Sequence, residues 1–446
     1  MLRVSNSKTL LLCTSALLVL GTAAYAADPQ LPAEAPSGFN WSGAYVGAGV
    51  GVGAVVHRFE ITDGVNSASI NGLGGEGVFG EVTAGYDHML SDRVLLGGFI
   101  DAHFGNIGPT IEASSGGVSV ADIKLTNSYG FDAGARLGYV VAPSTLAYVL
   151  GGYGWQHFKL DGSIPGGPAI SFSEDRSGYI LGVGMETAVS GNWTLKTEYR
   201  YSDYGNDVIA DLGGGTVLKI QPSTHTFHVG ANYRFGAQNG GGASFAAPSY
   251  DWTGFYAGGA LGAGSVVHDL TINPGGGIID ANGIGGEGVF GEASVGYDHD
   301  FGTWVAGVML DARYSGISTD IDGAALGIDG KIEADYGFDV LARAGMKVNE
   351  STLAYVLGGY SWQHFDVNAA IGGAPSTSLF DWDSSGFSLG GGLETAVTDN
   401  VTVGLEYRYS QFSNEDFSDL LGAPAGTVGV EPSFHTARLG LKYKFN

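Results

Sequence analysis

Polar and apolar residues alternate with a period of two along much of this chain. Residues 81–87 alternate polar or very small side chains with Val82, Ala84 and Tyr86. The same alternation runs through the segments that begin at Tyr129, Leu195 and Phe227. Because successive side chains of a β-strand point to opposite faces, this period predicts strands with one apolar face and one polar face.

Short turns alternate with long loops between these predicted strands. Short turns are expected near Ser91-Asp92, Ala142-Pro143 and Gly191-Asn192. Longer polar or glycine-rich loops are expected at residues 58–74, 109–123, 159–171 and 203–221. This alternation is typical of up-and-down transmembrane barrels, in which the short turns face the periplasm and the long loops face outside.

The chain repeats itself with a period of about 210 residues, which indicates a duplicated domain. Residues 71–81 read NGLGGEGVFGE, and residues 282–292 read NGIGGEGVFGE. Residues 144–153 return at 351–360, and each copy continues with Trp-Gln-His-Phe. We expect two domains, 41–236 and 251–446, preceded by a spacer at 27–40 and joined by a linker at 237–250.

A sheet that faces lipid must close, because open edges would leave backbone groups unpaired. Gly47, Gly49, Gly51 and Gly53 share one face of a predicted strand, which fits the crowded interior of a narrow barrel of about eight strands. The join between the copies is rich in Gly, Ala and Ser, as a flexible linker is. The expected fold is all-β, with two tandem antiparallel up-and-down transmembrane barrels of about eight strands each. The alternative is one fused barrel of about sixteen strands.

The first residues have the features of a secretory signal peptide. Arg3 and Lys8 precede an apolar stretch at 10–20, and Ala24-Tyr25-Ala26 provides a small-residue cleavage site. We therefore expect residues 1–26 to be removed after export. The single cysteine, Cys13, lies inside this segment, so the mature chain is expected to hold no disulfide and no thiolate metal site.

The charge balance excludes nucleic acid as a partner. Asp and Glu number 45 against 20 Lys and Arg, which gives a formal net charge of −25, and phosphate backbones bind to basic surfaces. Glycine accounts for 77 of the 446 residues, but 44% hydrophobic and 11% aromatic residues argue against a disordered low-complexity chain.

Four short motifs occur once in each copy. A Trp-Ser/Thr-Gly-x-Tyr opening starts at Trp41 and Trp252, and the other motifs are Gly-Tyr-Asp at 85–87 and 296–298, Glu-Tyr-Arg-Tyr at 198–201 and 406–409, and Tyr-x-Phe at 233–235 and 443–445. Each copy thus resembles the OmpA-like small-barrel family, in its alphaproteobacterial branch of outer-membrane immunogenic or porin-like proteins. The resemblance implies the bacterial outer membrane as location, its lipids as surroundings, and the barrel assembly machinery as a partner during biogenesis. The tandem duplication departs from the single barrel usual in that family.

Charged residues on the polar strand faces are predicted to point into the barrel lumen. They are Glu81, Asp101, Asp132, Arg136, Glu186, Glu198 and Arg200 in the first copy, and Glu292, Asp311, Asp339, Arg343, Glu394, Glu406 and Arg408 in the second. Buried charges must be paired, so a salt-bridge network that plugs a narrow barrel is expected, with an ion path as the alternative. No nucleophile or substrate cleft accompanies the paired carboxylates, and neither catalysis nor a cofactor is predicted.

His57, His157 and His225 are expected near the extracellular rim. Histidines gathered there have the chemistry to bind haem or a metal ion, and some relatives in the family are associated with haemin binding. The plainer interpretation is that these histidines are interface residues beside aromatic side chains. The aromatic residues near the strand ends are predicted to form the membrane girdle, namely Trp41, Tyr139, Trp193, Tyr199, Tyr201, Trp252 and Tyr407.

The predicted function is that of a non-enzymatic outer-membrane barrel protein with a structural and surface-presenting role. It would support envelope integrity and expose loops to a host or environmental ligand. A first alternative is a passive diffusion porin, which requires the copies to form one wide barrel. A second alternative is surface binding of haem or metal.

Overall fold

The computed structural model describes residues 39–115, 118–163, 169–238, 245–273, 277–323, 328–372, 375–419 and 422–445. The predicted signal peptide, most of the spacer and residues 239–244 of the linker lie outside these ranges. The described residues form nineteen strands joined by antiparallel pairing. None of them forms a helix that is long and apolar enough to cross a membrane.

The first copy closes into a barrel of its own. Its strands are β1 (Gly43–Thr62), β2 (Ser67–Met89), β3 (Val94–Ile107), β4 (Thr110–Ser115), β5 (Val118–Ala142), β6 (Thr145–Ser163), β7 (Ile170–Ser190), β8 (Trp193–Asp203), β9 (Asp207–Gly213) and β10 (Thr216–Arg234). Strand β10 returns to β1 and pairs with it from Tyr45–Arg234 to Thr62–Val217. The short strands β4 and β9 continue β3 and β8 along the neighbouring strands β5 and β10. The ring therefore has eight strand positions.

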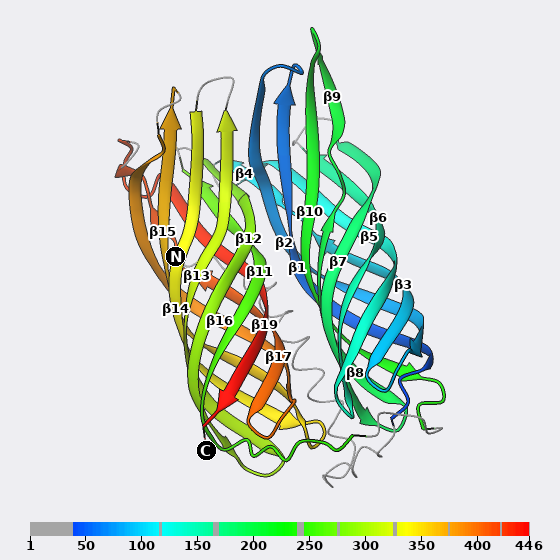
Figure 1. Ribbon diagram of the computed structural model, residues 1–446. Helices are drawn as coiled ribbons and strands as arrows, with labels where there is room; N and C mark the ends of the chain where they lie inside the picture. Colours follow the sequence, from blue (N-terminus) through cyan, green and yellow to red (C-terminus); the bar gives the residue numbers. More distant parts are fainter. Residues whose placement is uncertain are drawn as a thin grey trace.

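The second copy closes in the same way. Its strands are β11 (Gly254–Ile272), β12 (Gly277–Asp300), β13 (Trp304–Gly323), β14 (Ile328–Lys347), β15 (Thr352–Ile371), β16 (Thr377–Ala396), β17 (Val401–Phe412), β18 (Glu415–Asp416) and β19 (Val428–Lys444). Strand β19 pairs with β11 from Tyr256–Lys444 to Ile272–Val428. The prediction of two tandem antiparallel barrels is confirmed, and the two stand side by side (Figure 1). A single wide barrel does not describe this pairing.

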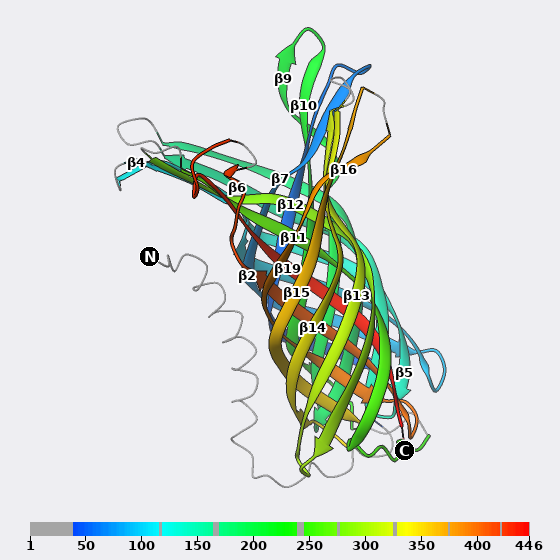
Figure 2. The same ribbon diagram turned by 90° about the vertical axis from the view of Figure 1, so that its left-hand side faces the viewer.

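The two ends of each barrel differ. We call the end with short turns, at residues 90–93, 143–144 and 191–192 in the first copy, the turn end. The opposite end is the loop end, where strands such as β9 and β10 extend well beyond the barrel (Figure 2). Strands β2, β4, β12 and β13 also pair between the copies near this end, for example Ile284 with Leu73. The extensions were predicted as loops, and they are largely hairpins.

Glycines make room for large side chains in the narrow interior. A β-carbon on Gly51 would lie 2.0 Å from the Phe79 ring, and one on Gly47 would lie 2.0 Å from Asn232 Oδ1. In a barrel of about eight strands the interior is just wide enough for side chains to fill it. The predicted glycine column therefore faces the lumen.

The outer surface carries an apolar belt, as expected of strands that face lipid. Exposed side chains on it include Val46, Leu96, Ile100, Leu137 and Val149 in the first copy and Val308, Val340, Val356 and Leu441 in the second. Tyr139 and Trp193 are about half exposed near the turn end, where a girdle residue is expected to lie.

The girdle prediction is wrong for three aromatic residues. Trp41 and Trp252 are 0% and 2% exposed, and Trp41 lies inside the barrel mouth, 4.8 Å beneath the guanidinium of Arg234. Tyr407 is also buried, because it packs against Phe227 of the other barrel. The two tryptophans precede their strands, so strand alternation gave no indication of their direction.

Candidate functional site

An ion-paired cluster fills the turn end of the first barrel. Arg136 on β5 donates to Asp87 on β2 and, over 3.0 Å, to Glu186 on β7. Arg234 on β10 pairs with the same two carboxylates, at 2.8 Å from Asp87 and 2.9 Å from Glu186. It also donates to the backbone carbonyl of Trp41 over 3.0 Å. Two arginines and two carboxylates from four strands thus close this end.

A second cluster lies deeper in the same lumen and is built around Arg200. Its guanidinium reaches Asp101 at 2.5 Å, Asp132 at 2.8 Å and Glu198 at 2.5 Å. The Arg200 side chain is only 2% exposed. Because each carboxylate stands on a different strand from the others, one cation links β3, β5 and β8 across the interior.

Glu81 on β2 belongs to the lumen network of the first barrel and has partners on β8 and β10. Lys196 on β8 approaches it to 2.9 Å, and His228 on β10 approaches it to 2.7 Å. The Glu81 side chain is 1% exposed, so its charge is offset by the Lys196 ammonium and by a hydrogen bond from His228 instead of by bulk water.

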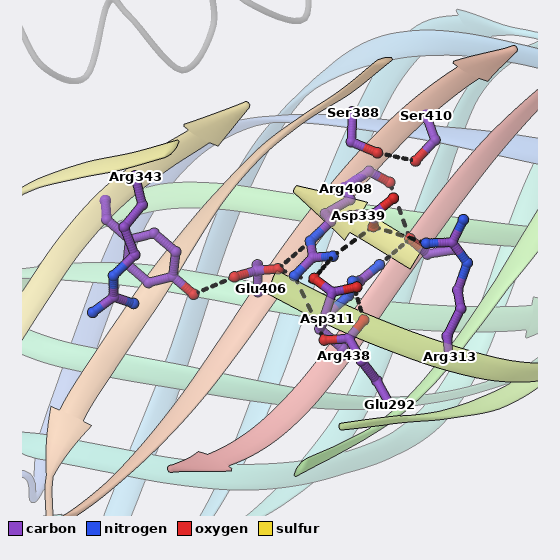
Figure 3. Close-up of polar contacts among 12 residues, drawn as sticks. Glu292, Asp311, Arg313, Asp339, Arg343, Ser388, Glu406, Arg408, Ser410 and Arg438 are labelled. Atoms are coloured by element: carbon purple, nitrogen blue, oxygen red, sulfur yellow. Dashed lines mark hydrogen bonds and ion pairs between the residues drawn. The ribbon is translucent and has the colours of Figure 1, made fainter. Parts of the chain in front are cut away.

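The second barrel repeats the arrangement (Figure 3). Arg408 reaches Asp311 at 2.7 Å, Asp339 at 2.9 Å and Glu406 at 2.6 Å. Arg343 binds Asp298 and, at 2.7 Å, Glu394.

The two copies neutralise equivalent carboxylates from different positions. Glu292, the counterpart of Glu81, pairs with Arg438 at 2.6 Å, and Gly404 stands where the first copy has Lys196. Glu394 takes Lys442 at 2.8 Å, which occupies the position of Asn232. The buried charges remain paired although the partner has moved, which is what the cost of an unpaired buried charge requires.

The lumen side chains that the sequence analysis selected therefore all lie inside the barrels, each within ion-pair distance of an opposite charge. Sequence reasoning missed further members of the networks, namely Asp87, Lys196, His228, Arg234, Asp298, Arg313, Arg438 and Lys442. Several of them share strand parity with selected residues, and that signal was sufficient to find them. Beside each network lies a cavity of about 30 Å³, which has room for ordered water.

A reciprocal pair of contacts joins the two barrels near the loop end. Glu76 on β2 accepts a hydrogen bond from His435 on β19 over 2.8 Å. Its counterpart Glu287 on β12 lies 3.0 Å from His225 on β10 and also accepts from Ser223 over 2.7 Å. Each barrel thus contributes the equivalent glutamate, which contacts the equivalent histidine of the other barrel, as in a twofold symmetric dimer.

The interface continues from these pairs to the turn end. Phe227 and Tyr407 stack with their ring centroids 5.2 Å apart, within a shared cluster that includes Met185 and Leu393. At the turn end, the hydroxyl groups of Thr145 and Thr352 lie 2.9 Å apart. Outward-facing side chains that a lone barrel would show to lipid are therefore buried against the other copy.

The three histidines selected as haem or metal candidates lie in three environments. His57 is buried inside the first barrel, where its Nδ1 donates to the carbonyl of Leu73. His157 faces outward and binds Asp175 at 2.6 Å, and His225 lies in the interface. Within the described residues, no hydrogen bond, ion pair or ring contact joins one of these histidines to another.

One group in the described part of the chain has metal-ligand spacing. Ligand atoms of Asp101, His103 and Asp132 all lie within 4.8 Å of one another. The Arg200 guanidinium already bridges both carboxylates. A metal cation there would have to displace the arginine, so the arrangement favours an internal ion pair.

Comparison with known proteins gives a consistent result. A profile of the outer membrane protein beta-barrel domain matches residues 14–235 and 240–445. The 31 kDa outer-membrane immunogenic protein of Brucella melitensis biotype 1 is 31% identical over 243 residues, which cover 51% of this chain and 100% of that protein. The 22 kDa outer membrane protein of Rhizobium leguminosarum bv. viciae is 31% identical over 202 residues, which cover 44% of this chain and 80% of that protein. Neisserial surface protein A aligns with a TM-score of 0.26 at 18% identity, over 43% of this chain and 98% of that structure.

Proposed function

Because this chain belongs to the outer membrane protein β-barrel family and resides in the bacterial outer membrane, we propose that it acts as a non-enzymatic double anchor. It holds two sets of loop-end hairpins on the cell surface and adds a large, rigid protein body to the envelope. The relatives it resembles are outer-membrane proteins named for their immunogenicity. Surface exposure of loops is the property that this role requires.

The observation that carries the proposal is that each copy closes separately around a filled interior. Arg136, Glu186 and Arg234 occupy the turn end, and Arg200 with its carboxylates occupies the middle. Passive diffusion, the first alternative, depended on one wide lumen shared by both copies, and the strand pairing gives each copy its own. A filled barrel supports anchoring and display.

The inter-barrel contacts support a single rigid platform. The Glu76–His435 and Glu287–His225 pairs and the Phe227–Tyr407 stack fix one barrel against the other. Hairpins of both copies are then presented in a fixed relation, which two independent barrels would not provide.

Single-channel recording of the refolded full-length protein in planar bilayers tests the absence of a wide pore. We expect no stable large conductance, because the cavities beside the buried ion pairs have room only for water. A general porin recorded in the same bilayers is the positive control. Large, stable openings at porin-like conductance would contradict the proposal.

Epitope insertion tests surface presentation. A tag is inserted after Gly64, in the exposed turn between β1 and β2, and in a second protein after Gly191, in the short turn before β8. Exposed turns tolerate insertions well. We expect antibody to label intact cells that carry the Gly64 tag, and to reach the Gly191 tag only after the outer membrane is permeabilised. If intact cells were labelled only when the tag follows Gly191, the barrels would have the opposite orientation to the one proposed.

A further inference from the structure

The loop end of the first barrel encloses an apolar cavity of about 350 Å³. This size lies at the lower end of the about 300–1,000 Å³ typical of small-molecule pockets. Its wall is made chiefly of aliphatic and aromatic side chains, among them Leu73, Ile111, Leu125, Phe158 and Ile220. The cavity is separate from the ion-paired networks described above, whose residues are not part of its wall.

His57 is one of the wall residues, and its ring has a polar atom without a partner. The side chain is 0% exposed, and its Nδ1 lies 3.1 Å from the carbonyl oxygen of Leu73. A carbonyl only accepts, so Nδ1 carries the proton and Nε2 of the neutral ring is an acceptor. Nε2 has no hydrogen-bond partner among the described residues. A buried polar atom without a partner is costly, and a ligand with a donor group would satisfy it.

Among the described wall residues, Arg176 is the one fully buried charge, and it is already neutralised. Arg176 donates to Glu174 and to Asp207, in each case over 3.0 Å. An anionic ligand would therefore find no free cation among these residues. A neutral ligand would lose little hydration free energy when it enters the cavity.

In the second barrel, a tryptophan side chain fills the equivalent space. Phe158 pairs with Glu174 across β6 and β7, and in the other copy Phe365 pairs with Trp382 across β15 and β16. Trp382 stacks on Phe365 with centroids 4.7 Å apart and ring planes 9° apart. Two otherwise equivalent positions thus differ by an indole, which makes the second copy an internal control for the cavity.

We propose that this cavity is a binding site for a small, neutral, mainly apolar molecule with one O–H or N–H donor, of the class of phenols and naphthols. The apolar wall would take the ring, and His57 Nε2 would accept the hydrogen bond. Phe172, Ile123 and Ile209 are 58%, 41% and 40% exposed, so the wall reaches the molecular surface at the loop end and gives such a molecule a way in.

The test uses the refolded full-length protein in detergent micelles, titrated with 1-naphthol and, separately, with naphthalene by isothermal calorimetry. The two probes differ only in the hydroxyl group. Partitioning into micelles is common to all variants and cancels in the comparison. Circular dichroism establishes that each variant is folded before titration.

Four variants separate the contributions. Glu174→Trp copies the second barrel and should abolish saturable binding, whereas Glu174→Gln removes the charge but not the space and should retain it. His57→Phe should weaken 1-naphthol about tenfold, the loss of about one hydrogen bond to a buried acceptor, and leave naphthalene unchanged. His268→Phe, the matched change in the second barrel, should alter neither.

The proposal is overturned if the wild-type protein shows no saturable binding of 1-naphthol. It is also overturned if Glu174→Trp binds 1-naphthol as the wild type does, or if His57→Phe and His268→Phe weaken binding equally. The conductance and labelling experiments on the proposed function do not depend on any of these results.

Discussion

A single arginine in each lumen holds several carboxylates, and its loss should be costly. Arg200 bridges Asp101, Asp132 and Glu198. Replacing it by Met fills similar space but leaves three buried carboxylates without their shared cation. We expect Arg200→Met to lower the free energy of unfolding by about 3–5 kcal/mol, measured by urea unfolding in detergent micelles.

The control is Arg58→Met, which removes an exposed arginine bonded to Ser69 and should change stability by no more than about 0.5 kcal/mol. Equal effects of the two substitutions would mean that the lumen network adds nothing particular to stability.

The lumen-facing glycines of β1 are required by space. Gly51→Val would push a side chain into the Phe79 ring, and overpacking of this kind costs about 1–3 kcal/mol. On the outer surface, Gly291 has open space where a β-carbon would stand, so Gly291→Val should be nearly neutral. The midpoints of urea unfolding measure both. A neutral Gly51→Val would place that glycine outside the crowded lumen.

For single residues, the sequence predicted well which way a side chain points, but it predicted poorly which side chains it contacts. Strand parity placed Glu81, Arg136 and Arg200 on the polar face, and they do point into the lumen. Parity has only two values, inside and outside. It therefore offered no way to see that the outward-facing His225 and Tyr407 meet the other barrel instead of lipid.

At the scale of elements, the strands and short turns followed from the period-two pattern, because alternation is a local property. The extensions β4 and β9 did not, since their polar, glycine-rich sequences lack that alternation and depend on the long neighbouring strands β5 and β10 for pairing. The contact between β6 and β15 could not be predicted either, because nothing in the sequence distinguishes a threonine that starts an interface strand from any other threonine.

That docking is directly testable because the only cysteine, Cys13, lies in the predicted signal peptide. The hydroxyl oxygens of Thr145 and Thr352 are 2.9 Å apart, close enough for a disulfide between cysteines at these positions. We expect the double variant Thr145→Cys, Thr352→Cys to cross-link on oxidation, seen as altered mobility of the denatured chain on non-reducing gels.

The matched control pairs Thr145→Cys with Val308→Cys, which lies on the exposed outer face of the second barrel and should not cross-link. If both pairs react to the same extent, or neither does, the barrels do not dock through β6 and β15 as described.

At the scale of the whole molecule, duplication has produced a covalent counterpart of a symmetric dimer. Gly74 and Gly285 face each other so closely that a β-carbon on either would lie within 3 Å of the other's Cα. The Glu76–His435 and Glu287–His225 pairs flank this approach. The repeat in the sequence predicted two similar domains, but the symmetric interface between them emerges only from three-dimensional packing.

Separate refolding of the two copies tests whether each closes as its own barrel. Residues 27–238 and 245–446 are produced as two chains and refolded apart in detergent micelles. Since β10 returns to β1 and β19 returns to β11, we expect each chain alone to give a β-sheet circular dichroism spectrum and the heat-dependent gel mobility of a folded barrel. Failure of both chains to fold apart, with recovery only when they are mixed, would show that the copies complete one another's sheet and do not close separately.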